Sequence, residues 1–116
     1  MAKIYVTDIY TPEQIAFYAA KFHAGVDGQD TTDVAYFVQK GEGGPIKIGY
    51  TNCIKARMRS LKTAHGKECI LLATRRGGMD REGAYHFQFA ADFIGKEWFE
   101  PSPAILAEIE RLSDES

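Results

Sequence analysis

Two short runs of β-branched and aromatic residues, joined by a glycine-rich turn, constrain the fold of this chain more than any other feature. The first run is Val-Ala-Tyr-Phe-Val-Gln at residues 34–39, and the second is Ile-Lys-Ile-Gly-Tyr at residues 46–50. The connection contains Gly-Glu-Gly-Gly at residues 41–44. β-Branched and aromatic residues favour strands, and a short glycine-rich link between two strands is typical of a β-hairpin. The sequence therefore predicts a hairpin near the middle of the chain.

Helix and strand signals alternate after this hairpin. We expect a helix from about residue 52 to 65, with Gly66 as its C-terminal stop. The apolar run at 69–74 predicts a third strand that is buried on both faces. Two glycines at 77–78 then break the chain before a helix over about 80–93. The expected fold class is α/β (α+β), with a small three-stranded, mostly antiparallel sheet flanked by helices.

The two ends of the chain add further helices. Thr11 as N-cap, Pro12 at the first helical position and Gln14 at the capping-box position predict a helix to about residue 24. A strand is expected before it at residues 3–10 and a loop after it, so residues 1–33 form an N-terminal extension. The extension is either a structural addition that covers a sheet edge or an arm for dimerisation or substrate recognition.

The remaining chain is expected to form one domain with a helix attached to it. The length of 116 residues suits a single ordinary domain. We place the main domain at 34–100. A C-terminal helix within 101–116, capped by Ser102 and amphipathic to about residue 112, is expected to pack on that domain.

Composition excludes several classes of protein. No apolar run approaches the roughly 18 residues that cross a bilayer, so we expect no membrane association. The first residues carry no secretory pattern. The two cysteines, Cys53 and Cys69, are too few for a disulfide scaffold and lack zinc-site spacing. A cytoplasmic protein with reduced thiols is therefore expected.

The net charge of -2 hides a strongly basic middle section. Residues 40–81 contain ten Lys and Arg residues against three acids, whereas both flanking sections are acidic. Such a distribution either concentrates a positive patch that suits a phosphate-rich partner, or forms a solvated helix with unpaired lysines. The candidate nucleic-acid-binding cations are Lys40, Lys55, Arg59, Lys62, Arg75 and Arg76.

One arginine on the helix after the hairpin stands apart from the other cations. Helical spacing places an apolar stripe on one side of this helix, formed by Ile54, Met58, Leu61 and His65. Arg57 projects alone beyond one flank of the stripe, whereas Lys55, Arg59 and Lys62 project beyond the other. Arg57 would either clamp a phosphate in bidentate fashion or pair with a local acid.

A carboxylate shares an apolar helix face further along the chain. Glu82 projects on the same side as Phe89 and Phe93, and His86 lies one turn after it. A buried carboxylate is costly unless it binds a cation, although a place in the first turn of a helix also stabilises it. His86 is either part of a site with Glu82 or a core histidine whose ring nitrogens are satisfied.

Together these residues resemble the GIY-YIG nuclease domain, over about residues 34–99. The ending Gly-Lys-Glu-Trp-Phe at 95–99 is similar to that of a bacterial and phage branch, whose second motif commonly begins Lys-Ile-Gly. The matching positions are Tyr36, Lys47 to Gly49, Arg57 and Glu82.

The resemblance implies a metal-dependent endonuclease that hydrolyses DNA phosphodiester bonds. By this analogy Tyr36 would help to activate the attacking water, and Arg57 would hold the scissile phosphate and stabilise its growing charge. Glu82 would bind one divalent cation, Mg²⁺ or Mn²⁺. Gly49 would let the backbone approach the site closely. The implied partner is DNA, including branched or single-stranded forms.

The sequence departs from the usual motifs of this family. The first motif reads Val-Ala-Tyr at residues 34–36, and Lys47 replaces the second tyrosine. Lys47 would serve as a further phosphate contact or lower the pKa of Tyr36. Tyr50 is expected to point to the face of the strand opposite Lys47, so it is no simple replacement for the second tyrosine.

A family histidine is also replaced, which leaves the activity open. Many members carry His four residues after the arginine, where this chain has Leu61, and His65 or His86 would have to substitute. The alternative to an active nuclease is a catalytically inactive nucleic-acid-binding or regulatory module on the same scaffold. A third alternative is a protein-interaction domain that meets an acidic partner.

Overall fold

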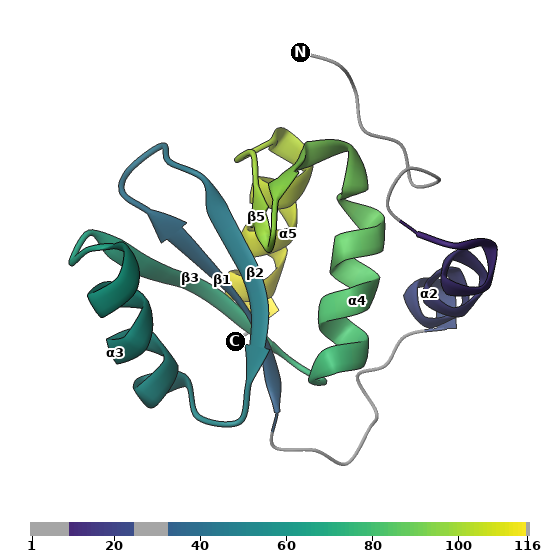
Figure 1. Ribbon diagram of the computed structural model, residues 1–116, viewed down its shortest axis with the longest axis horizontal. Coiled ribbons are helices and arrows are strands. Elements are labelled where there is room, and N and C mark those ends of the chain that lie inside the picture. Colours follow the sequence, from purple (N-terminus) through teal and green to yellow (C-terminus); the bar gives the residue numbers. More distant parts are fainter. Residues whose placement is uncertain (1–9, 25–32, 116) are drawn as a thin grey trace.

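A five-stranded antiparallel sheet organises the chain, with helices on both of its faces (Figure 1). The computed structural model describes residues 10–24 and 33–115. The strand order is β3-β1-β2-β5-β4. The strands are β1 (Val34–Lys40), β2 (Ile46–Thr51), β3 (Cys69–Arg76), β4 (Phe93–Gly95) and β5 (Trp98–Phe99). The helices are α2 (Pro12–Ala24), α3 (Ile54–His65), α4 (Met79–Gln88), the 3₁₀ helix η1 (Ala90–Asp92) and α5 (Pro103–Glu115).

The predicted hairpin is present at the centre of the sheet. β1 pairs with β2 in a register that sets Tyr36 opposite Gly49, and β3 pairs with the other edge of β1. Because side chains alternate along a strand, β1 contributes to both faces of the sheet. Ala35 and Phe37 enter one core, and Tyr36 and Val38 enter another.

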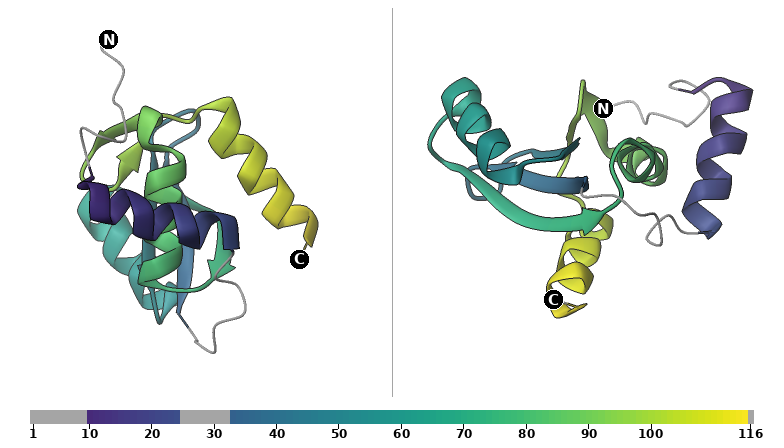
Figure 2. Two further views of the ribbon diagram at one scale, coloured as in Figure 1. Left: turned by 90° about the vertical axis from the view of Figure 1, so that its right-hand side faces the viewer. Right: turned by 90° about the horizontal axis from the view of Figure 1, so that it is seen from below.

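The two cores separate the helices into two layers. The larger core lies between the sheet and the helices α4 and α5, and it contains Phe37, Tyr85, Phe99 and Ile105. The smaller core lies under α3, where Leu61 is buried. Figure 2 shows α3 on the side of the sheet away from α4. The α+β class and the helix-flanked antiparallel sheet are therefore confirmed.

Local signals at the helix ends are confirmed by their hydrogen bonds. The Gln14 amide donates to the Thr11 hydroxyl, while the Gln14 side chain accepts from the Thr11 amide, which is a capping box. Gly66, with φ of 112°, donates its amide to the Lys62 carbonyl and ends α3. The Ser102 hydroxyl accepts from the Ile105 amide at the start of α5.

The sheet has two more strands than predicted, and the helix α4 is shorter than predicted. Phe93 begins β4 because it pairs with Phe99 across a second small hairpin, so α4 ends at Gln88 rather than near residue 93. The third strand is also not buried on both faces. It forms an edge of the sheet, with Ile70 49% and Leu71 38% exposed. An apolar run does not reveal which strand will lie at the edge.

The N-terminal helix packs on another helix and not on a sheet edge. The Tyr18 ring of α2 lies over Gly83 of α4, where an added Cβ would come within 2.0 Å of a ring carbon. Tyr10 contacts both Tyr18 and Phe87 edge-on. The strand expected at residues 3–10 lies almost entirely outside the described residues. Within the described ranges 10–24 and 33–115, no helix combines the length and the apolar character needed to span a membrane.

Candidate active site

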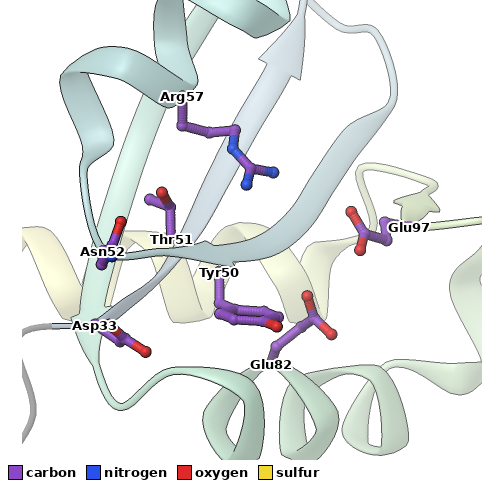
Figure 3. Close-up of a pocket in the computed structure, with 7 residues that line it drawn as sticks. All are labelled: Asp33, Tyr50, Thr51, Asn52, Arg57, Glu82 and Glu97. Carbon is purple, nitrogen blue, oxygen red and sulfur yellow. The ribbon is translucent and has the colours of Figure 1, made fainter.

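A polar pocket opens where β2 ends, between the first turns of α3 and α4. Its volume is about 420 Å³. β5 pairs with β2 only at Ile46 and Lys47. Glu97 and His86 bind the backbone of Ile48, and the last residues of β2, Tyr50 and Thr51, line the pocket. Figure 3 shows side chains from β2, α3, α4 and the turn between β4 and β5 around this space. The lining residues are Asp33, Tyr50, Thr51, Asn52, Arg57, Glu82 and Glu97.

Tyr36 contacts Arg57 from behind the surface of this pocket. The Arg57 guanidinium donates to the Tyr36 hydroxyl over 3.4 Å. The Tyr36 side chain is fully buried and does not line the pocket. Burial raises the pKa of Tyr36 and the nearby carboxylates raise it further, whereas Arg57 lowers it. Tyr36 is therefore a neutral hydroxyl at pH 7, and Arg57 is its contact toward the pocket.

Gly49 makes room for the Tyr36 ring. The two residues are register partners on β1 and β2, and a Cβ at position 49 would lie 2.4 Å from the Tyr36 hydroxyl oxygen. Any side chain there would displace the ring. The close approach at Gly49 is thus between its backbone and the tyrosine that holds Arg57.

Glu82 faces Arg57 from the first turn of α4. Its backbone amide donates to the Gly78 carbonyl, which fixes the start of the helix. Its Oε2 atom is buried and has no hydrogen-bond partner among the described residues. Burial and the adjacent Glu97 carboxylate raise the pKa of Glu82 to about 7, against the lowering effect of Lys47 and Arg57. The Glu82 carboxylate therefore lines the pocket, and one of its oxygens is buried without a hydrogen-bond partner among the described residues.

Lys47 does not point at a free space for phosphate. Its Nζ lies 3.1 Å from Glu97 Oε2, and it sits 5.6 Å from the centre of the Trp98 ring. The Lys47 side chain is 15% exposed. The structure therefore joins Lys47 to the pocket through Glu97, and the pKa of Tyr36 is raised instead of lowered.

His86 has a structural partner away from the pocket. Its Nε2 lies 2.7 Å from the Ile48 carbonyl oxygen, and its ring contacts Phe99 edge-on. Burial lowers the pKa of His86, so the ring is neutral at pH 7. Of the two interpretations of the sequence, the structure matches the satisfied core histidine. His65, the other candidate substitute, contacts Trp98 and also does not line the pocket.

The six candidate nucleic-acid-binding cations lie in different places. Lys55, Arg59 and Lys62 are exposed along α3 and line a groove floored by Ile54, Met58 and Leu71. Lys40 and Arg76 are exposed at the two ends of the sheet strands. Arg75 differs, because Tyr85 and Glu108 hold its guanidinium on the α5 side.

Several lining residues were not among those expected from the sequence. Asp33 precedes β1 and Asn52 follows β2, and these loop positions gave no chemical signal. Tyr50 lies within β2 and was considered only as a replacement for the second tyrosine. Glu97 could have been found, because it belongs to the Gly-Lys-Glu-Trp-Phe ending that the resemblance singled out.

The donor set of the pocket fits a hard divalent cation. Among residues 10–24 and 33–115, no three His, Cys, Asp or Glu side chains gather closely enough to hold a metal by themselves. Mg²⁺ is usually held by only one or two carboxylates, with water and substrate phosphate as its other ligands. The Glu82 carboxylate, which lines the pocket and whose buried Oε2 has no hydrogen-bond partner among the described residues, would supply one such ligand.

Comparison with known protein families matches residues 33–113 to a model described as the T5orf172 domain. No curated protein and no solved structure matches the chain. The matched segment starts at Asp33 and contains every residue that lines the pocket.

Proposed function

Because the chain belongs to the T5orf172 domain family, we propose that it is a metal-dependent endonuclease that hydrolyses DNA phosphodiester bonds. The family itself suggests a nuclease or DNA-binding role. One observation carries the proposal further. Arg57 and Glu82, from different helices, face each other across one open polar pocket.

A guanidinium opposite a carboxylate suits phosphodiester hydrolysis. Arg57 would bind two oxygens of the scissile phosphate and stabilise the charge that grows on them. Glu82 would hold a divalent cation, which when bound offsets charge on the phosphate and on the leaving oxygen. Water supplies the hydroxyl that stays on phosphorus and the proton that ends on the leaving oxygen as the bridging bond breaks.

The role proposed for Tyr36 follows from its burial. Its hydroxyl is covered and contacts Arg57, so it acts by orienting the guanidinium and not by touching water. This differs from the role that the resemblance to GIY-YIG nucleases implies. Gly49 supports the arrangement by leaving space for the tyrosine ring.

Cleavage of DNA tests this function directly. Purified protein should nick supercoiled plasmid, or cut branched or single-stranded DNA, in the presence of Mg²⁺ or Mn²⁺. Arg57→Ala and Glu82→Gln should each reduce the rate about 100-fold or more, as for loss of a group that stabilises transition-state charge. Lys67→Ala is the control, because Lys67 is an exposed cation outside the pocket that is not among the candidate DNA-binding residues. Absence of cleavage on all three substrates would contradict the proposal.

A nucleic-acid-binding module without activity is the second candidate. The exposed Lys55, Arg59 and Lys62 on α3 favour DNA binding whether or not the pocket is active. Binding of DNA by the wild-type protein, with no cleavage in either metal, would support this candidate.

A further inference from the structure

The turn between β4 and β5 carries an acid into the pocket at a conformational cost. Lys96 has φ of 55°, the one non-glycine residue with positive φ in the described part of the chain. A left-handed conformation is unfavourable for a non-glycine residue, and it persists only where the surroundings fix it. Glu97 follows directly and lines the pocket with Glu82 (Figure 3).

Contacts at both its backbone and its side chain hold Glu97 in this position. The Glu97 carbonyl accepts a hydrogen bond from the Ile48 amide at 3.0 Å, directly after the two β2 residues that pair with β5. Its Oε2 pairs with Lys47, whose own ammonium rests beside Trp98. Glu97 is therefore fixed by β2 and is not a freely moving surface acid, although its side chain is 37% exposed.

Glu82 and Glu97 line the same pocket from two different parts of the chain (Figure 3). Two carboxylates that share one site repel each other unless a cation lies nearby. Lys47 contacts Glu97, and Arg57 contacts Tyr36, while Glu82 Oε2 remains unpartnered. A divalent cation would neutralise the pair.

We propose that Glu97 is a second carboxylate ligand, beside Glu82, for the divalent cation of this site, and that Lys47 orients it. The inference rests on the metal dependence in the proposed function. It also gives Lys47 a role in place of the second tyrosine of the family motif. The lysine sets the position of an acid that the turn at residues 95–97 brings in.

Mn²⁺ binding to the full chain without DNA tests the inference. Free Mn²⁺ is measured by electron paramagnetic resonance during a titration. Glu82→Gln and Glu97→Gln should each raise the dissociation constant about tenfold or more, the least expected when a group that supports a metal site is lost. Glu42→Gln, an exposed acid in the turn at the other end of the hairpin, should leave it unchanged. Wild-type affinity in Glu97→Gln, or no Mn²⁺ binding by the wild-type protein, would overturn the inference.

A second variant separates ligation from folding. If thermal unfolding shows that Glu97→Gln has lost its structure, Glu97→Asp keeps the charge and shortens the reach. Weaker Mn²⁺ binding by a folded Glu97→Asp supports ligation, and unchanged binding overturns it.

The outcome is also distinguishable from failure of the proposed function. If the wild-type protein cuts DNA and Glu97→Gln binds Mn²⁺ with wild-type affinity, the proposed function stands and only the role of Glu97 as a ligand is wrong. If Mn²⁺ binding requires both Glu82 and Glu97 but the protein cuts no DNA, the two-carboxylate metal site stands and the nuclease function is wrong.

Discussion

The Tyr36 hydroxyl accepts a hydrogen bond from Arg57, 21 positions later in the chain, and so joins the first strand to the helix that follows the hairpin. The tyrosine is fully buried while the arginine reaches the pocket. The bond therefore fixes the Arg57 guanidinium, the group proposed to bind phosphate, relative to the sheet.

Removing the Tyr36 hydroxyl should loosen Arg57 without emptying the core. In Tyr36→Phe the ring still fills its place beside Val38 and Leu61. We expect DNA cleavage to slow about tenfold, because a charged group that must be held in place is no longer fixed. The effect should fall on kcat more than on KM. Tyr18→Phe on α2, outside the pocket, is the control, and equal rates for both variants would contradict this role.

Gly49→Ala should destabilise the protein and also reduce activity. The new Cβ would lie 2.4 Å from the Tyr36 hydroxyl oxygen, so the ring must move. Overpacking of this kind costs about 1–3 kcal/mol of unfolding free energy, which urea denaturation would measure. The effect should shrink in a Tyr36→Leu background, since contacting residues are not additive. Equal costs in the two backgrounds would show that the ring is not the obstacle.

Features that depend on neighbouring residues could be predicted from the sequence. The hairpin, the Thr11 capping box and the Gly66 stop each depend on neighbouring residues, and the structure confirms all three. Arg57 and Glu82 were also singled out by helical spacing alone. The features that spacing missed depend on strand order. The exposure of β3 follows from its edge position, and Glu97 reaches the pocket only because β5 pairs with β2.

Stability should fall in acid through an ion-paired carboxylate on α5. Burial alone would raise the pKa of Glu108, but hydrogen bonds from Arg111 and Tyr85 and the charge of Arg75 lower it overall. A carboxyl with a lower pKa in the folded state stabilises the protein above its unfolded pKa, and that stability is lost as pH falls through the folded value. Its contribution is thus present at pH 7 and disappears below the usual range near 4.5.

Urea unfolding of the wild-type protein and of Glu108→Gln between pH 7 and pH 3 measures this contribution. The difference in unfolding free energy should be largest at pH 7 and should narrow as the pH falls below about 4.5. Glu110→Gln, an exposed acid on the same helix, should show a small difference at every pH. A constant gap between wild type and Glu108→Gln would mean that Glu108 acts by packing alone.

The salt dependence of DNA binding should distinguish the exposed cations on α3, which contact DNA, from Arg75, which pairs with Glu108. Each phosphate contact contributes about 0.9 to the slope of log K against log salt concentration. Lys55, Arg59 and Lys62 are exposed on α3, so replacing all three by alanine should lower the magnitude of the slope by up to about three. Arg75→Ala should leave the slope unchanged and reduce stability instead, because Glu108 holds its guanidinium at 3.2 Å. Fluorescence anisotropy with a labelled duplex across a range of salt concentrations gives the slope. An unchanged slope in the triple variant would place the DNA on another face of the protein.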